Sequence, residues 1–145
     1  MHGFSSLRVA LRQAPGRWTD ACFGALLGLL LAGPAQAEWS KLGSSDADSI
    51  YVDYSSLRKN GNIARVLMLR DAATPYQSAQ GQPINSRKLL FEFDCSASQY
   101  RVKFLSAHSG HMGSGDLVES FGDVDAMQTV PEGTIAAGML QIACR

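Results

Sequence analysis

Alternating hydrophobic and polar residues predict antiparallel strands in the second half of the chain. In residues 87–95, one face of a strand would carry Leu89, Phe91, Phe93 and Cys95, and the other Lys88, Leu90, Glu92 and Asp94. Residues 100–105 alternate in the same way, and the link 96–99 has the length of a hairpin loop. Pairing of the two strands would place Glu92 or Asp94 beside Arg101 or Lys103, in exposed ion pairs that each contribute under about 1 kcal/mol.

Four further segments have the short apolar runs of strands: residues 39–42, 50–53, 63–69 and 117–121. Residues 63–69 are apolar on both faces apart from Arg65, which predicts a central strand covered on each side. Residues 54–57 predict a helical turn. Asn60-Gly61 predicts a type I′ hairpin turn, because both central residues of that turn need positive φ. Residues 71–86 are rich in Pro, Gly and polar side chains, which favours a mobile surface loop.

The pattern changes to a helical period from Pro131 onward. Pro131 suits a first helical turn, and Glu132 suits the positive end of a helix dipole. On a helical wheel the polar or small positions form one narrow stripe, made of Thr134, Gly138, Gln141 and Arg145. We therefore expect this helix to be buried on most of its surface. The predicted fold is α+β: an antiparallel sheet of about five to six strands with a C-terminal helix packed on it.

Residues 1–37 have the three parts of a secretory signal peptide. The basic residues are Arg8, Arg12 and Arg17, the apolar run is 22–32, and the small-x-small cleavage site is Ala35-Gln36-Ala37. This run is about half the roughly 20 residues that a membrane span needs, which argues against an anchor. Cys22 precedes it and so cannot be the lipid-bearing cysteine of a lipoprotein. We expect cleavage between Ala37 and Glu38, leaving residues 38–145 as a single exported domain with no membrane span.

The predicted mature chain is weakly acidic. It has 108 residues, with 10 basic and 12 acidic side chains, so its net charge is −2. Nucleic acids and anionic membranes attract basic surfaces, and this chain has no polybasic run. Both classes of partner are therefore disfavoured.

Two cysteines, Cys95 and Cys144, follow the predicted cleavage site. An oxidising compartment favours a disulfide between them, which would tie the C-terminal helix to the strand that ends at Cys95. Such a bond closes a loop of about 50 residues and would contribute roughly 4 kcal/mol by chain entropy. Two free buried thiols are the alternative. A zinc site is less favoured, because zinc prefers four ligands.

The glycine-rich segment 106–116 contains the side chains most suited to chemistry. His108 and His111, with Asp116, have the groups of a metal site, but three glycines predict a flexible loop rather than a rigid ligand frame. The glycine spacing precedes no predicted helix, so it does not indicate a phosphate site. Ser109, His108 and Asp116 offer the groups of a hydrolase without a nucleophile motif.

Two carboxylates on predicted strands, Asp53 and Glu92, are interpreted as surface charges. We predict no catalytic residue, no metal and no cofactor.

Several short motifs occur in order along the mature chain: Glu38-Trp39, residues 50–62, residues 92–95, Arg101, Leu105-Ser106, residues 109–113, residues 130–134 and Cys144. Together they resemble the surface-adhesin protein E family of exported bacterial domains. The resemblance implies an antiparallel sheet with a C-terminal helix tied by a disulfide. It also implies adhesins that bind host extracellular-matrix and plasma proteins, with dimers among them.

These observations favour a non-enzymatic, adhesin-like binding domain, either periplasmic or secreted to the cell surface. Its expected partner is a host-matrix or envelope protein, and a homodimer is one expected assembly. Residues 71–86 and 106–116 are the expected contact surfaces. One alternative is a structural or assembly partner of an envelope complex. The other is a small periplasmic hydrolase that uses His108 and His111.

Overall fold

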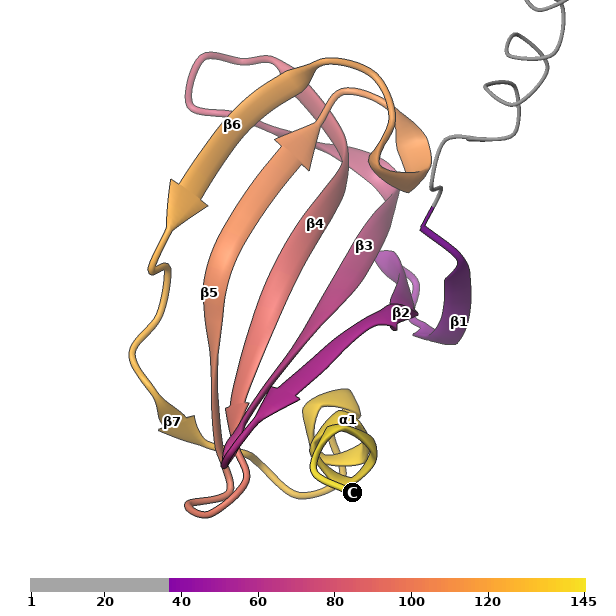
Figure 1. Cartoon of the computed structure of the whole chain (residues 1–145). Helices are drawn as coiled ribbons and strands as arrows, with labels where there is room; N and C mark the ends of the chain where they lie inside the picture. Colours follow the sequence, from indigo (N-terminus) through magenta and orange to yellow (C-terminus); the bar gives the residue numbers. More distant parts are fainter. Residues whose placement is uncertain (1–36) are drawn as a thin grey trace, which may run out of the picture. The chain divides into compact units, whose positions relative to one another are not determined.

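The computed structural model describes residues 37–145, so most of the predicted signal peptide lies outside the described residues. Seven antiparallel strands form one sheet in the order β1-β2-β3-β4-β5-β6, and β7 pairs with the start of β5 (Figure 1). The strands are β1 (Trp39–Ser44), β2 (Asp48–Asn60), β3 (Ile63–Gln77), β4 (Pro83–Asp94), β5 (Gln99–His108), β6 (Leu117–Gly122) and β7 (Gln128–Thr129). A 3-10 turn, η1 (His111–Gly113), follows β5, and one helix, α1 (Ile135–Ala143), follows β7. The predicted fold class is confirmed.

The β2–β3 hairpin has the predicted position but a different turn. Asn60 pairs with Ile63, so the central residues are Gly61 and Asn62, and only Gly61 has a positive φ, of 58°. This is the pattern of a type II′ turn, so the predicted type I′ turn is wrong. The predicted helical turn at 54–57 is also wrong, because these residues form a bulge within β2, where Ser56 Oγ accepts a hydrogen bond from the Leu67 amide.

Most of the predicted loop at 71–86 belongs to strands. β3 continues to Gln77 and β4 begins at Pro83, which leaves only residues 78–82 as a connection. Tertiary packing overrides the breaker residues: Ala72 and Ile84 are buried, and the Tyr76 hydroxyl donates to Asp48 over 2.9 Å. The Arg87 guanidinium lies 4.4 Å from the centre of the Tyr76 ring. The prediction of a mobile loop here is therefore wrong.

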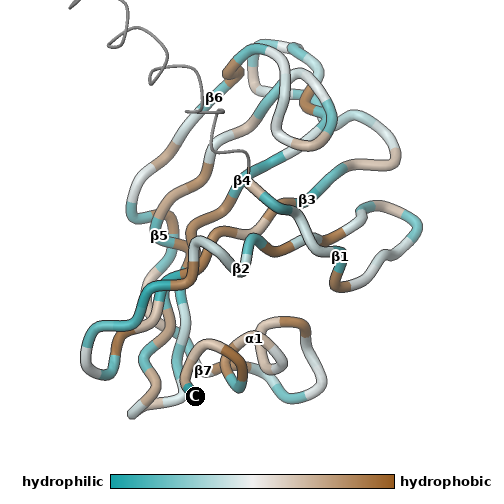
Figure 2. Tube along the Cα trace, turned by 45° about the vertical axis from the view of Figure 1, so that its right-hand side comes forward, coloured by the Kyte–Doolittle hydropathy of each residue, from teal (hydrophilic) through white to brown (hydrophobic). Residues whose placement is uncertain are grey.

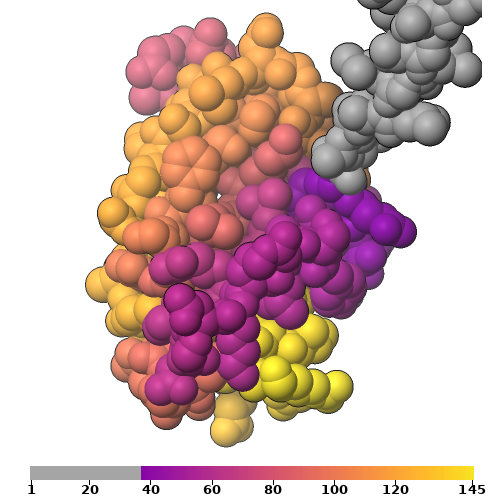
Figure 3. Space-filling view, viewed as in Figure 1, coloured from indigo at the N-terminus to yellow at the C-terminus, as the bar shows by residue number. Residues whose placement is uncertain are grey.

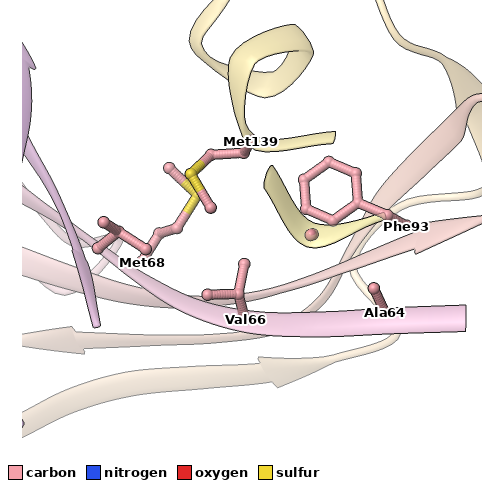
Figure 4. Packing of buried hydrophobic residues seen from close by; sticks show 7 residues of the cluster. Ala64, Val66, Met68, Phe93 and Met139 are labelled. Carbon is pink, nitrogen blue, oxygen red and sulfur yellow. The ribbon is translucent and has the colours of Figure 1, made fainter. Parts of the chain in front are cut away.

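The core lies between α1 and one face of the sheet. Figure 4 shows the side chain of Met139 of α1 pointing toward Met68 of β3, with Val66 of β3 and Phe93 of β4 in the same cluster. Figure 2 shows hydrophobic residues gathered along the middle of β3, β4 and β5. The core is completed by Val52, Ala64 and Ala143.

The helix begins later and is less buried than the apolar pattern predicts. It starts at Ile135, and the Thr134 side chain caps it by accepting a hydrogen bond from the Ala137 amide. Only Met139 and Ala143 of α1 are buried, whereas Ile135 and Ile142 are exposed. The expectation that most of its surface would be buried is wrong, because a single sheet covers one side of it.

The Cys95–Cys144 disulfide joins the end of β4 to the end of α1, with the two Cα atoms 5.5 Å apart. Lys59 of β2 adds a second tie at this point, because its Nζ donates to the Cys144 carbonyl over 2.9 Å. The predicted attachment of the last element to the middle of the chain is therefore present.

Glu92 is buried on the face of the sheet opposite α1, rather than exposed as predicted. It is 3% exposed and lies in register between Arg65 of β3 and Arg101 of β5. Its carboxylate accepts from Arg65 Nε over 2.6 Å and from Arg101 Nε over 2.8 Å. Asp53 is also buried, at 5%, and accepts from the Ser55 amide and hydroxyl. Neither carboxylate is the simple surface charge that the sequence indicated.

Candidate binding surfaces

The loop between β5 and β6, residues 109–116, is fastened to the sheet. Asn85 Nδ2 donates to the Ser109 carbonyl over 2.6 Å, and the Ser86 hydroxyl donates to the Gly110 carbonyl over 2.5 Å. The same hydroxyl accepts from the Gly113 amide over 2.8 Å. The predicted flexibility of this loop is wrong, because β4 side chains satisfy its backbone.

Asp71 of β3 holds the tip of this loop. Its carboxylate accepts from the Met112 amide over 2.7 Å and lies 3.2 Å from His111 Nδ1. Met112 has a φ of 54°, a left-handed conformation that costs a non-glycine residue about 1–2 kcal/mol. An exposed apolar side chain is thus held in one strained position at the loop tip. Sequence reasoning missed Asp71, because the contact joins residues about 40 positions apart.

The backbone path of the loop requires glycine at two positions. Gly113 has a φ of 72°, a left-handed conformation that strains a residue with a β-carbon. Gly115 has a φ of 74°, and a β-carbon there would lie 2.7 Å from the Gly110 amide nitrogen. These two glycines therefore permit a tight loop, instead of providing mobility.

The two histidines have separate surroundings. His108 Nε2 lies 3.1 Å from the Ser106 hydroxyl, whereas His111 contacts Asp71. Burial, followed by the nearby charge of Lys88, lowers the pKa of His108, so its ring is neutral at pH 7. Within residues 37–145, no group of three side chains is placed to hold a metal ion.

The three residues that could serve a hydrolase do not form a catalytic triad. The Ser109 hydroxyl accepts from the Asp116 backbone amide over 2.9 Å, and its described partners do not include His108. A Ser-His-Asp mechanism needs the serine hydroxyl on the histidine and a carboxylate behind it. The arrangement of Ser109, His108 and Asp116 does not provide this chain of contacts.

An open groove lies between the start of α1 and the sheet and has a volume of about 340 Å³. Apolar side chains from four strands and α1 form most of its wall: Ile50, Met68, Leu89, Phe91, Tyr100, Val102, Ile135 and Ala136. The rings of Phe91 and Tyr100 stack with their centres 5.9 Å apart. Arg70, which pairs with Asp48, and Asp125 supply the charged groups. Because five elements build this groove, no local sequence pattern could reveal it.

The sheet, the helix and the disulfide define a small α+β domain in which the C-terminal helix is covalently attached to the sheet. A family model described as surface-adhesin protein E matches residues 39–145. The chain therefore belongs to the surface-adhesin protein E family, as the sequence resemblance predicted. Membership in this family implies an exported surface protein of adhesin type.

Solved structures of Haemophilus influenzae protein E share the fold. One is 13% identical, with a TM-score of 0.54, and the match covers 79% of this chain and 90% of that one. A second crystal form is 12% identical, with a TM-score of 0.55, and the match covers 93% and 96% of the two chains. Protein E from a non-typeable strain is 12% identical with a TM-score of 0.52, covering 79% and 81%. No curated protein matches the chain.

The described part of the chain contains one α-helix, α1, and no helix there is long and apolar enough to cross a membrane.

Proposed function

We propose that this protein is an exported, non-enzymatic adhesin-like domain that binds an extracellular or envelope protein. The observation that carries the proposal is the family match, which extends over the whole sheet, the helix and both cysteines. The predicted cleavage between Ala37 and Glu38 would release this domain into an oxidising compartment, where its disulfide is stable.

The fastened loop 109–116 is the contact surface that we favour. Its tip presents His111 and Met112, both exposed, on a backbone already held by Asp71. A preorganised loop loses little conformational entropy on binding, so its contacts contribute more fully to affinity. The second predicted surface is reduced to the hairpin tip at residues 78–82, since the rest of 71–86 belongs to strands.

A binding panel tests this function. The mature domain, residues 38–145, is passed over immobilised extracellular-matrix, plasma and envelope proteins, and binding is measured by surface plasmon resonance. For any protein that binds, we expect Met112→Ala to weaken affinity on the order of tenfold, as a central apolar contact does. Ile142→Ala is the matched control, because Ile142 is an exposed apolar residue of α1 outside both predicted surfaces, and this variant should bind as the unaltered domain does.

Two results would contradict the proposal. Absence of binding across the panel by folded, oxidised protein would count against an adhesin-like role. Equal affinity of the Met112→Ala variant and the unaltered domain would remove the loop from the contact surface, even if the domain binds.

A further inference from the structure

Strand β6 is an edge strand with an open outer side. It is the last strand in the sheet order, so within residues 37–145 it has a strand partner only in β5. In Figure 3 the segment that contains β6 lies along the margin of the molecule, on the side opposite the indigo N-terminal strand. In an antiparallel strand, alternate backbone N–H and C=O groups point away from the neighbour. The outer side of β6 therefore presents a row of donors and acceptors to solvent.

Apolar side chains surround this open edge. Leu117 is 60% exposed and Phe121 is 52% exposed, near the two ends of β6. A bulge at Val118 places Leu117 on the opposite face of the strand, whereas Phe121 shares its face with Glu119. Phe104 of β5, 43% exposed, is opposite Gly122, where a β-carbon would meet nothing within 4 Å. Natural edge strands are usually protected by charged side chains, proline, a bulge or a covering element. The bulge at Val118 and the charge of Glu119 protect the first half of β6, whereas residues 120–122 contain no charge and no proline and pair with β5 in regular register.

The edge is also negatively charged. Residues 116–125 contain four carboxylates, Asp116, Glu119, Asp123 and Asp125, and no basic side chain. Asp123 is neutralised in part by Lys103, whose Nζ lies 3.0 Å away. No ion pair among the described residues includes the other three. A partner strand beside β6 would therefore gain from positive charge.

We propose that β6 binds an extended segment of a partner protein in which apolar and basic residues take turns at every second position, so that both kinds lie on one face of the segment. The segment adds to the sheet as an extra strand: its backbone pairs with the outer side of β6, an apolar side chain contacts Phe121, and a basic side chain lies beside Glu119. A second copy of β6 is a poorer occupant, because it would bring the same acidic residues to the contact. This inference rests on the proposed protein-binding function and specifies how the partner is recognised.

Synthetic peptides test the inference directly. The probe is a peptide as long as β6, six residues. Valine and lysine take turns at every second position, so that they share one face, and threonine fills the positions between them. Controls are a valine–glutamate peptide and the valine–lysine peptide methylated at every backbone nitrogen. We expect the valine–lysine peptide to bind the domain at least about tenfold more tightly than either control, and to slow hydrogen exchange at the amides of 117–122.

Variants locate the contact. Phe121→Ser should weaken peptide binding on the order of tenfold, whereas Ile142→Ser should leave it unchanged. Ile142 is the matched control, since it is an exposed apolar residue of α1 at 38%. Equal binding of the methylated peptide, equal loss in both variants, or no binding of the valine–lysine peptide would overturn the inference. So would a dimer that Phe121→Ser disperses, because the occupant would then be a second copy.

The two proposals can fail separately. If the domain binds proteins of the panel but not the valine–lysine peptide, the strand-addition inference is wrong and the binding function stands. If it binds the peptide along β6 but no panel protein, the edge is a peptide site and the adhesin-like role is not supported.

Discussion

Glu92 links three strands through a single buried charge. Burial by itself would raise the pKa of Glu92, but the hydrogen bonds and charges of Arg101 and Arg65 outweigh it and lower the pKa below its ordinary value. The folded pKa is therefore lower than the unfolded one. The ionised carboxylate stabilises the fold above the unfolded pKa of about 4.3, and this stabilisation is lost as pH falls through the folded pKa.

We expect Glu92→Gln to lower the free energy of unfolding by about 2 kcal/mol at pH 7, because two guanidinium groups lose their charged partner. The difference between the variant and the unaltered protein should shrink as the pH falls below the unfolded pKa of about 4.3, because the unfolded carboxyl then binds a proton more readily than the folded one. Urea unfolding at pH 7, 5 and 3, followed by circular dichroism, measures both effects. Glu132→Gln, at an exposed position, is the control. A difference that is the same at all three pH values would contradict this account.

Of the two ion pairs that Glu92 makes, the sequence could predict the one with Arg101. Alternation placed Glu92 on the polar face of its strand, and the short hairpin brought it beside Arg101. Arg65 is 27 residues away, and its pairing depends on the register between β3 and β4, which no local pattern specifies. The two arginines, which are themselves partly exposed, cover the carboxylate of Glu92, so a charge assigned to the surface is buried.

Helix α1 has only nine residues, so it is too short to be stable by itself and depends on its attachments. We expect the double variant Cys95→Ser/Cys144→Ser to lose up to about 4 kcal/mol of unfolding free energy. The loss should be accompanied by faster hydrogen exchange in 135–143 than in β3 and β4, because packing of Met139 and Ala143 alone would hold the helix.

Hydrogen exchange measured by mass spectrometry distinguishes this local effect from general destabilisation. Met139→Ala serves as the comparison, since it removes a buried contact of α1 and keeps the disulfide; we expect a loss of about 3 kcal/mol. Uniform acceleration of exchange across the sheet and helix in the double serine variant would show that the disulfide does not act through α1.

Elements with regular alternation were predictable, and those made by distant contacts were not. Residues 87–94 and 100–105 lie in strands as their period of two predicted, and residues 117–121 lie in β6 as their short apolar run predicted. The strand portions of 71–86 escaped prediction because Pro and Gly indicated a loop, while buried Ile84 and the Tyr76–Asp48 contact stabilise the hairpin. The helix was predicted to be buried on most of its surface, but a single sheet reaches only one side of it.

The domain is asymmetric: α1 packs on one face of the sheet, and within residues 37–145 no α-helix packs on the other face. The helix covers only part of its face, which leaves the groove near Ile135 and Phe91 open. The sequence predicted the layers and the disulfide correctly. It could not predict the groove, the fastened loop or the open β6 edge, because each is produced by the register and order of strands in the complete sheet.

Export determines whether this domain forms its disulfide, and processing can be tested on the full chain. Expressed in a bacterium with a periplasm, the protein should begin at Glu38 and contain the oxidised Cys95–Cys144 pair. Ala37→Leu should block cleavage and leave the precursor, because signal peptidase needs a small residue there. Gln36→Leu, at the tolerant position between the two small residues, is the control and should be processed normally. Intact-mass measurement without reductant distinguishes these forms. Retention of residues 1–37 in the unaltered protein, or two free thiols in its exported form, would refute the assignment of a cleaved signal and an oxidised domain.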